Sequence, residues 1–150
     1  MFAQKDFEID TVLSKPLMAH LSTVADGEPR DSPVWFIWED SSMWIFGTEN
    51  DSFIKRLHKE PRCAIGIVKF NLDQGILKHV GFRGVSKIHP TDQDRLSRFV
   101  SKYLGNNKLE WNKWFLKNIV NPLDAMVQIV PTSIVAKNVS FFKTGPDLAD

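Results

Sequence analysis

The sequence has only one cysteine, Cys63, among its 150 residues, which excludes an internal disulfide and leaves too few thiolates for a structural zinc site. It has no apolar run approaching the roughly 18 residues of a membrane helix, and residues 1–10 are acidic and polar rather than signal-like. The formal net charge of +1 argues against a broad basic surface for nucleic acid. We therefore expect a cytoplasmic protein that contacts neither a membrane nor a nucleic acid.

Familiar catalytic signatures are missing as well. The sequence contains no phosphate-binding loop, no dinucleotide-binding glycine fingerprint and no nucleophile elbow. The four histidines (His20, His58, His79 and His89) lack the spacing of zinc ligands. A hydrolase built on a catalytic triad therefore has no support.

Aromatic residues, in contrast, are abundant. There are five tryptophans and eleven phenylalanines, and Trp35, Trp38 and Trp44 fall within ten positions of each other. Planar rings at this density suit a core, a subunit interface or a planar ligand. Trp35 and Trp38 should point to opposite faces of one strand, so we expect one of them at an interface or a ligand. The length and the 43% hydrophobic content predict a single domain over residues 1–150.

Residue periodicity indicates strands joined by tight turns, with helices inserted between them. Asp26-Gly27 should form a hairpin turn, because this pair readily adopts positive φ. Gly81 and Gly84 suggest a bulge or a close backbone approach, and Pro131 marks an edge or a bulge. The expected strands cover residues 17–24, 29–39, 43–48, 62–70, 77–88, 125–130 and 133–142.

Helices are expected at residues 11–14, after residues 50–52 up to Pro61, from Thr91, and around Trp111 to Ile119, before Pro122. In the third of these, Thr91 with Asp94 resembles a capping box and residue 105 is a glycine placed to end the helix. Strands outnumber helices. This favours a mainly β (α+β) fold, an antiparallel barrel with a few peripheral helices.

Two consecutive segments resemble a known family. The first runs from Gly27 to Trp38 (GEPRDSPVWFIW) and continues with Met43 to Thr48 (MWIFGT). The second, Glu49 to Ile65, reads ENDSFIKRLHKEPRCAI, and Arg83-Gly84 in a later strand fits as well. Their order and spacing resemble the pyridoxamine 5'-phosphate oxidase-like flavoproteins, over roughly residues 18–88. The resemblance implies an antiparallel split β-barrel that binds FMN between the two subunits of a homodimer.

The resemblance also implies roles for individual residues. The backbone from Ser32 to Phe36 would lie along the edge of the isoalloxazine ring, whose donors and acceptors a strand can match. Thr48 and the N-terminus of the next helix would hold the phosphate, and His79 would approach from the partner subunit. The implied cofactor-binding residues are Ser32, Pro33, Val34, Trp35, Phe36, Thr48, Asn50, Ser52, Lys55, Arg56 and His79.

The chain departs from the family pattern at the phosphate. Phe53-Ile54 follow Ser52 where family members carry Arg-Lys, so we expect Lys55 or Arg56 to supply the countercharge. The alternative readings are a plain helix cap for the serine, a solvated helix face for the basic residues, and an interface role for His79. Acidic neighbours at positions 49 and 51 would oppose a phosphate unless they point to solvent.

We interpret these features as an FMN-dependent oxidoreductase with a small-molecule substrate. The protein would supply placement and electrostatics rather than an acid–base pair. Residues 138–150 hold no counterpart of the substrate-phosphate residues of pyridoxamine phosphate oxidase, so vitamin B6 is not the expected substrate. The alternatives are the same fold with the deazaflavin F420 or haem, or a non-catalytic, dimeric flavin-binding stress-response module.

Overall fold

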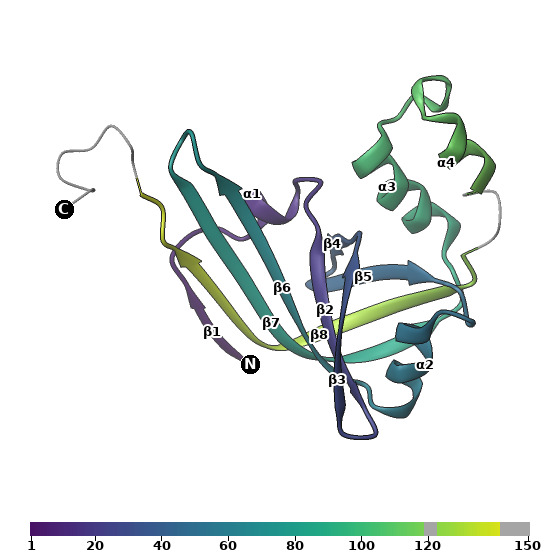
Figure 1. Ribbon diagram of the computed structural model, residues 1–150, viewed down its shortest axis with the longest axis horizontal. Helices are drawn as coiled ribbons and strands as arrows, with labels where there is room; N and C mark the ends of the chain where they lie inside the picture. Colours follow the sequence, from purple (N-terminus) through teal and green to yellow (C-terminus); the bar gives the residue numbers. More distant parts are fainter. Residues whose placement is uncertain (119–122, 142–150) are drawn as a thin grey trace.

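Alternating segments and tight turns produce strands that follow one another with little intervening loop (Figure 1). The computed structural model describes residues 1–118 and 123–141. Within them the strands are β1 (Phe2–Lys5), β2 (Ala19–Ala25), β3 (Glu28–Val34), β4 (Ile37–Glu39), β5 (Ser42–Gly47), β6 (Arg62–Asn71), β7 (Ile76–His89) and β8 (Ala125–Asn138). The helices are α1 (Asp10–Leu13), α2 (Ser52–Lys59), α3 (Gln93–Leu104) and α4 (Lys113–Asn118), with a 3₁₀ turn at Lys108–Glu110.

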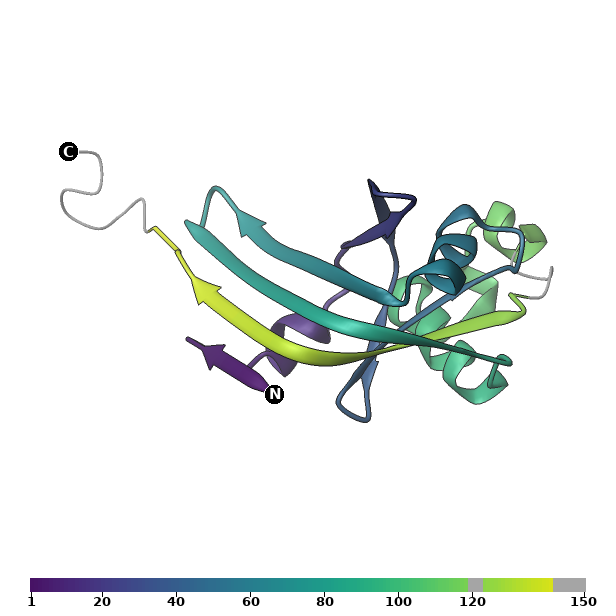
Figure 2. The same ribbon diagram turned by 90° about the horizontal axis from the view of Figure 1, so that it is seen from below.

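The strand order shows that the sheet closes on itself. Along the path β3-β2-β6-β7-β8-β5-β4, strands β3 and β4 lie at opposite ends, yet only Trp35 and Phe36 separate them in the chain. Because three Cα–Cα steps span at most about 11 Å, the sheet must curl until its two ends meet (Figure 2). The predicted mainly β fold, an antiparallel split barrel with peripheral helices, is confirmed.

The two long strands β7 and β8 carry a bulge. Arg83 pairs with Ser133 and the next residue, Gly84, pairs with Pro131, so β8 contains one extra residue at this point. A Cβ on Gly84 would lie 2.6 Å from the carbonyl oxygen of Val130, too close for any side chain. The bulge expected from the glycine and the proline is therefore confirmed.

Two hydrophobic clusters hold the helices to the sheet. The larger fills the barrel and takes in Leu13 from α1 and Ile54 and Leu57 from α2. The smaller joins β5 to α3 and consists of Trp44, Phe46, Phe99, Val100 and Met126. Each of these three helices therefore buries one apolar face against the barrel.

The strand expected over residues 29–39 is wrong as a single element. β3 ends at Val34 and pairs with β2, whereas β4 begins at Ile37 and pairs with β5. The residues between them continue the apolar pattern, so periodicity alone carries no sign of the break. The break arises because the chain crosses here from one end of the sheet to the other.

The expected strands 125–130 and 133–142 are also corrected, because β8 runs unbroken through Pro131, which sits at the bulge. β1 was not expected from the sequence; its pairing with β8 is parallel. Residues Ile119, Pro122 and Phe142 of the expected elements lie outside the described residues.

The cap of α3 differs from the expected one by a single position. The side chain of Asp92 accepts hydrogen bonds from the N–H groups of Asp94 and Arg95. The hydroxyl of Thr91, the expected cap, instead donates to the carbonyl of Leu123. The helix nevertheless ends at residue 104, before the predicted glycine.

Candidate functional site

Strand β3 presents three of the predicted ring-edge residues, Ser32, Pro33 and Val34, at an edge of the sheet. It pairs with β2 alone, so among the described residues its other side carries backbone N–H and C=O groups without a ladder partner. Such an edge can bind a ligand with matching donors and acceptors. This is the geometry that the predicted flavin contact requires.

The backbone of Phe36, in contrast, is already engaged. Its N–H donates to Tyr103 Oη at 3.0 Å and its carbonyl accepts from Lys102 Nζ at 3.0 Å. The Tyr103 hydroxyl also donates to the carbonyl of Leu17 at 2.7 Å, and Lys102 Nζ donates to that of Leu13 at 2.8 Å. Two polar side chains of α3 therefore hydrogen-bond to the segment between β3 and β4, the two end strands of the sheet, which do not pair with each other.

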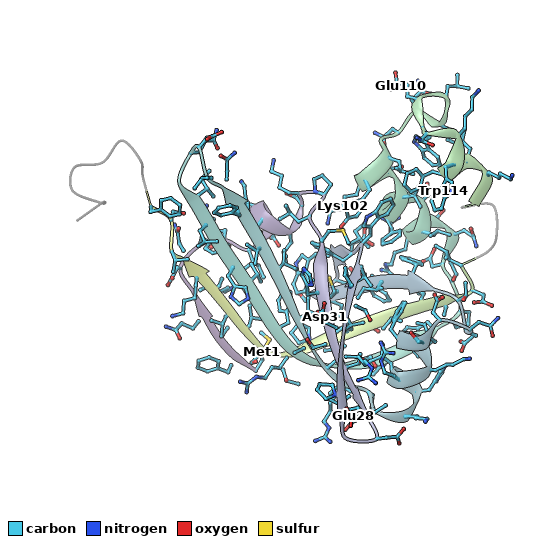
Figure 3. The ribbon with its side chains drawn as sticks, in the orientation of Figure 1. Met1, Glu28, Asp31, Lys102, Glu110 and Trp114 are labelled. Atoms are coloured by element: carbon cyan, nitrogen blue, oxygen red, sulfur yellow. The ribbon has the colours of Figure 1, made fainter. Side chains whose placement is uncertain are left out.

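Burial shifts the pKa of both side chains. Desolvation lowers the pKa of Lys102 to about 7. It raises the pKa of Tyr103 to about 12, against the effect of the hydrogen bond with Phe36. Figure 3 shows Lys102 at the point where α3 meets the barrel. Tyr103 thus stays a neutral phenol that can accept and donate at once, while the charge of Lys102 changes near neutral pH.

The tryptophans of this region pack within the chain. Trp35 stacks on Tyr103, with ring centroids 4.4 Å apart and planes inclined by 2°, and also on Phe115 of α4 at 5.5 Å. Trp38 stacks on Phe82 inside the barrel at 5.2 Å. Trp38 packs against the larger cluster and Trp35 against the smaller one. Intramolecular packing accounts for both, so neither requires an interface or a ligand.

Two predicted site residues, Arg56 and Ser32, are in direct contact. Arg56 Nε donates to Thr23 Oγ1 at 2.8 Å, and its Nη2 donates to Ser32 Oγ at 3.1 Å. Both partners are neutral hydroxyls. The guanidinium is therefore held in one orientation between α2 and β3 while its charge stays uncompensated by these contacts.

This guanidinium lies in a cleft of about 270 Å³ between α2 and the β2–β3 hairpin. The hairpin tip that forms one wall carries Glu28, labelled in Figure 3. The cleft is lined by Ala25, Asp26, Glu28, Arg30, Lys55, Arg56 and Lys59. Four cations against two carboxylates make it the best candidate anion site in the described chain.

The N-terminus of α2, where the phosphate was predicted, is surrounded by acidic groups. Asp51 Oδ2 accepts a hydrogen bond from the N–H of Thr48 at 2.8 Å, and the N–H of Glu49 donates to Asp124 Oδ1 at 3.0 Å. Ser52 and Asn50 are exposed beside them. These carboxylates offset the positive end of the helix dipole. The cations of α2 instead lie further along the helix, in the cleft.

His79 lies on β7, which β2 and β6 separate from β3. It borders a hollow of about 460 Å³ on the outer face of the sheet, where Gly66 and Gly81 have no side chain to cover the backbone. A Cβ on Gly81 would lie 3.2 Å from the His79 ring. One chain thus does not bring His79 to the other predicted residues. Its approach from a partner subunit stays a prediction.

Neither Tyr103 nor Lys102 was assigned a functional role from the sequence. The available signal was that Tyr103 is the single tyrosine of the chain. A buried phenol needs a hydrogen-bond partner, but its partners, residues 17 and 36, are distant in sequence.

Two kinds of feature are absent from the described residues. No group of three or more histidine, cysteine or acidic side chains is placed to hold a metal ion in that part of the chain. Nor does any helix there have the length and apolar character that crossing a membrane requires.

Comparison with known proteins places this geometry in context. The conserved hypothetical protein Rv2991 from Mycobacterium tuberculosis superposes with a TM-score of 0.71 at 20% identity, covering 96% of this chain and 94% of that one. An F420 reductase gives a TM-score of 0.62 at 22% identity, with 83% and 94% covered. An FAD-binding protein from Mesorhizobium loti gives 0.67 at 16% identity, with 91% and 96% covered.

These similarities establish the shared fold, and a search of curated proteins finds no match. The family model described as pyridoxamine 5'-phosphate oxidase, however, matches residues 6–136, which is most of the chain. The match includes β2 to β7 and most of β8, and thus both the edge strand and the basic cleft. The chain belongs to the pyridoxamine 5'-phosphate oxidase family.

Proposed function

We propose that the protein is an FMN-dependent oxidoreductase that acts on a small molecule as a homodimer. The observation that carries this proposal is the contact of Arg56 with Ser32, which puts a fixed cation beside a free sheet edge. FMN has the matching chemistry, because a ring edge of hydrogen-bonding groups and an anionic phosphate lie at its two ends.

Each part of the site then has a defined task. The open side of β3, from Ser32 to Val34, would bind the edge of the flavin ring through backbone groups. Arg56 and Lys55 would bind the phosphate by charge-assisted hydrogen bonds. The bound flavin would supply the hydride chemistry, for which the protein provides placement and electrostatics.

A second candidate within the same fold is a protein that binds the deazaflavin F420 or haem. One structural neighbour at 22% identity is an F420 reductase, and another at 15% is the haem storage protein HutZ from Vibrio cholerae. A non-catalytic flavin-binding module is the third possibility. These candidates differ in the bound chromophore and in turnover, which can both be measured.

The decisive measurement is the visible spectrum of freshly purified protein, followed by denaturation and mass analysis of the released cofactor. We expect a yellow protein that releases FMN and whose flavin is reduced by a nicotinamide nucleotide or another small donor. A fluorescent deazaflavin would favour the F420 candidate, and bound FMN without reduction would favour the module. A colourless protein that does not take up added FMN would refute the proposal.

A further inference from the structure

The basic cleft is longer than a single phosphate needs. Arg56 contacts Thr23 of β2, and one turn further along α2 Lys59 lies 3.5 Å from Asp26 at the hairpin turn. Helix and hairpin therefore run side by side toward the hairpin tip. Along this direction the cleft has an inner level at Arg56 and an outer level at Lys59.

The outer level has a second cation on the opposite wall. Arg30 lies on β3 two residues before Ser32 and on the same face, with its backbone directly opposite Thr23. Its guanidinium turns toward the hairpin tip, where Nη1 donates to the carbonyl of Pro29 at 3.0 Å. Two residues of a strand cover roughly 6.6 Å, and three residues of a helix roughly 4.5 Å. The Arg30 guanidinium and Lys59 thus both lie nearer the hairpin tip than the Arg56–Ser32 contact.

The cations of the outer level are only loosely paired. Lys59 Nζ is 3.5 Å from Asp26 Oδ2, and Arg30 Nη1 is 3.9 Å from Glu28 Oε2. All four side chains are more than half exposed. Exposed pairs of this kind contribute at most about 1 kcal/mol, so an anion with good geometry can displace the carboxylates. The cleft as a whole keeps an excess of two positive charges.

We propose that the outer end of the cleft, between Arg30 and Lys59, binds a second phosphate group beside that of the flavin. This inference rests on the proposed function, because the flavin phosphate defines the inner level. The second phosphate has two sources. It is either the second phosphate of a flavin dinucleotide, or the phosphate of a separate molecule that exchanges electrons with bound FMN.

The test compares riboflavin, FMN and FAD, which carry no, one and two phosphates. Their dissociation constants are measured by quenching of flavin fluorescence in the wild type and in the double variant Arg30→Gln/Lys59→Gln. A control double variant, Lys15→Gln/Lys87→Gln, removes the same charge at exposed positions outside the cleft. Calorimetry of FMN-loaded protein with inorganic phosphate, at constant ionic strength, provides the arm for a separate molecule.

If the second phosphate belongs to the flavin, FAD binds the wild type more tightly than FMN, and FAD replaces FMN as the cofactor of the proposed oxidoreductase. The cleft variant then loses about tenfold or more of its FAD affinity, while riboflavin and FMN change less than about twofold. If it belongs to a separate molecule, FMN-loaded wild type and control bind phosphate and the cleft variant does not. Equal affinities for FAD and FMN, together with no phosphate binding, would overturn the inference alone. Failure of all three flavins to bind would overturn the proposed function, and the inference with it.

Discussion

The hydroxyl of Tyr103 accepts a hydrogen bond from the backbone N–H of Phe36, 67 residues away in sequence, across 3.0 Å. The same oxygen donates to the carbonyl of Leu17 at 2.7 Å. One phenol thus satisfies two backbone groups at the place where the barrel is split.

Replacing Tyr103 with phenylalanine should lower the free energy of unfolding by about 1–3 kcal/mol, because it leaves a buried N–H and a carbonyl without their partner. The ring stack on Trp35 is retained, so the loss reports the hydroxyl alone. Urea denaturation measures it. Ser97→Ala, which removes an exposed hydroxyl from the same helix, should cost less than about 0.5 kcal/mol. Equal costs for the two variants would contradict this account.

The neighbouring Lys102 predicts a pH dependence. Its pKa is about 7 in the folded protein against 10.5 as the ordinary value. Between these values the unfolded chain binds a proton that the folded chain does not, so stability rises with pH, by at most about 1.4 kcal/mol per pH unit. Burial raises the pKa of Cys63 from 9.0 to about 12, and Tyr103 is raised as well. These two groups therefore lower the stability above about pH 9.

We accordingly expect the urea midpoint of the wild type to rise between about pH 7 and pH 9. Lys102→Met keeps the apolar stem and removes the titrating group, so its midpoint should be nearly constant over the same range. A wild-type midpoint that falls with pH, or an unchanged slope in the variant, would show that Lys102 is not the responsible group.

The local features of the fold were predictable from the sequence, whereas the long-range contacts were not. The hairpin at Asp26, the helix ending before Pro61 and the bulge at Gly84 depend on local backbone preferences, and they were predictable. The break at residues 35–36 and the hydrogen bonds of Tyr103 and Lys102 depend on which strands meet when the sheet closes. Closure brings together residues far apart in sequence, and no periodicity encodes that.

The same distinction applies to the candidate site. The sequence and its family resemblance selected both Ser32 and Arg56, because each belongs to a recognisable segment. They could not show that the two side chains touch, nor that the outer cations Arg30 and Lys59 line the same cleft. The carboxylates around the start of α2 were partly foreseen, since Glu49 was expected to oppose a phosphate.

Lys55→Ala and Arg56→Ala test phosphate recognition. Each should remove a charge-assisted contact of about 1.5–3 kcal/mol and weaken FMN binding roughly 10- to 150-fold. Arg56→Ala should have at least the effect of Lys55→Ala, because it also releases Ser32. Riboflavin should bind the wild type and both variants almost equally, and Lys59→Ala should leave FMN affinity nearly unchanged. If all of these variants bind FMN like the wild type, the phosphate lies elsewhere.

Two glycines of the sheet should respond differently to alanine. At Gly84 a methyl group would lie 2.6 Å from a backbone oxygen of β8, so Gly84→Ala should lower stability by about 1–3 kcal/mol. At Gly66 the nearest atom is 3.7 Å away, an ordinary contact with the His79 ring. Gly66→Ala should therefore be almost neutral. Thermal unfolding of the two variants side by side distinguishes them, and similar losses would refute the role of the bulge.

The proposed homodimer predicts an interface of about 2,000 Å² or more in total. Trp35 and Trp38, one of which was expected at an interface or a ligand, both pack within the chain. A more direct reason to expect a subunit interface is the set of exposed valines on the outer sheet face, Val24, Val85 and Val130. Val85→Lys should shift sedimentation equilibrium toward monomer and weaken flavin retention. Leu109→Lys, at an exposed residue of the 3₁₀ turn, should do neither. A stable, cofactor-loaded wild-type monomer would be fatal to this prediction.

The strand order also determines which parts of the sheet can form during translation. By residue 89 the chain contains β3, β2, β6 and β7, which are neighbours in the sheet, and separately the β4–β5 hairpin. The two pieces share no strand pairing until β8, residues 125–138, joins β7 to β5. From residue 89 until β8 is made, the nascent protein therefore carries two open sheet edges, on β7 and on β5, and such edges invite aggregation. Both edges are paired only when β8 has been synthesised.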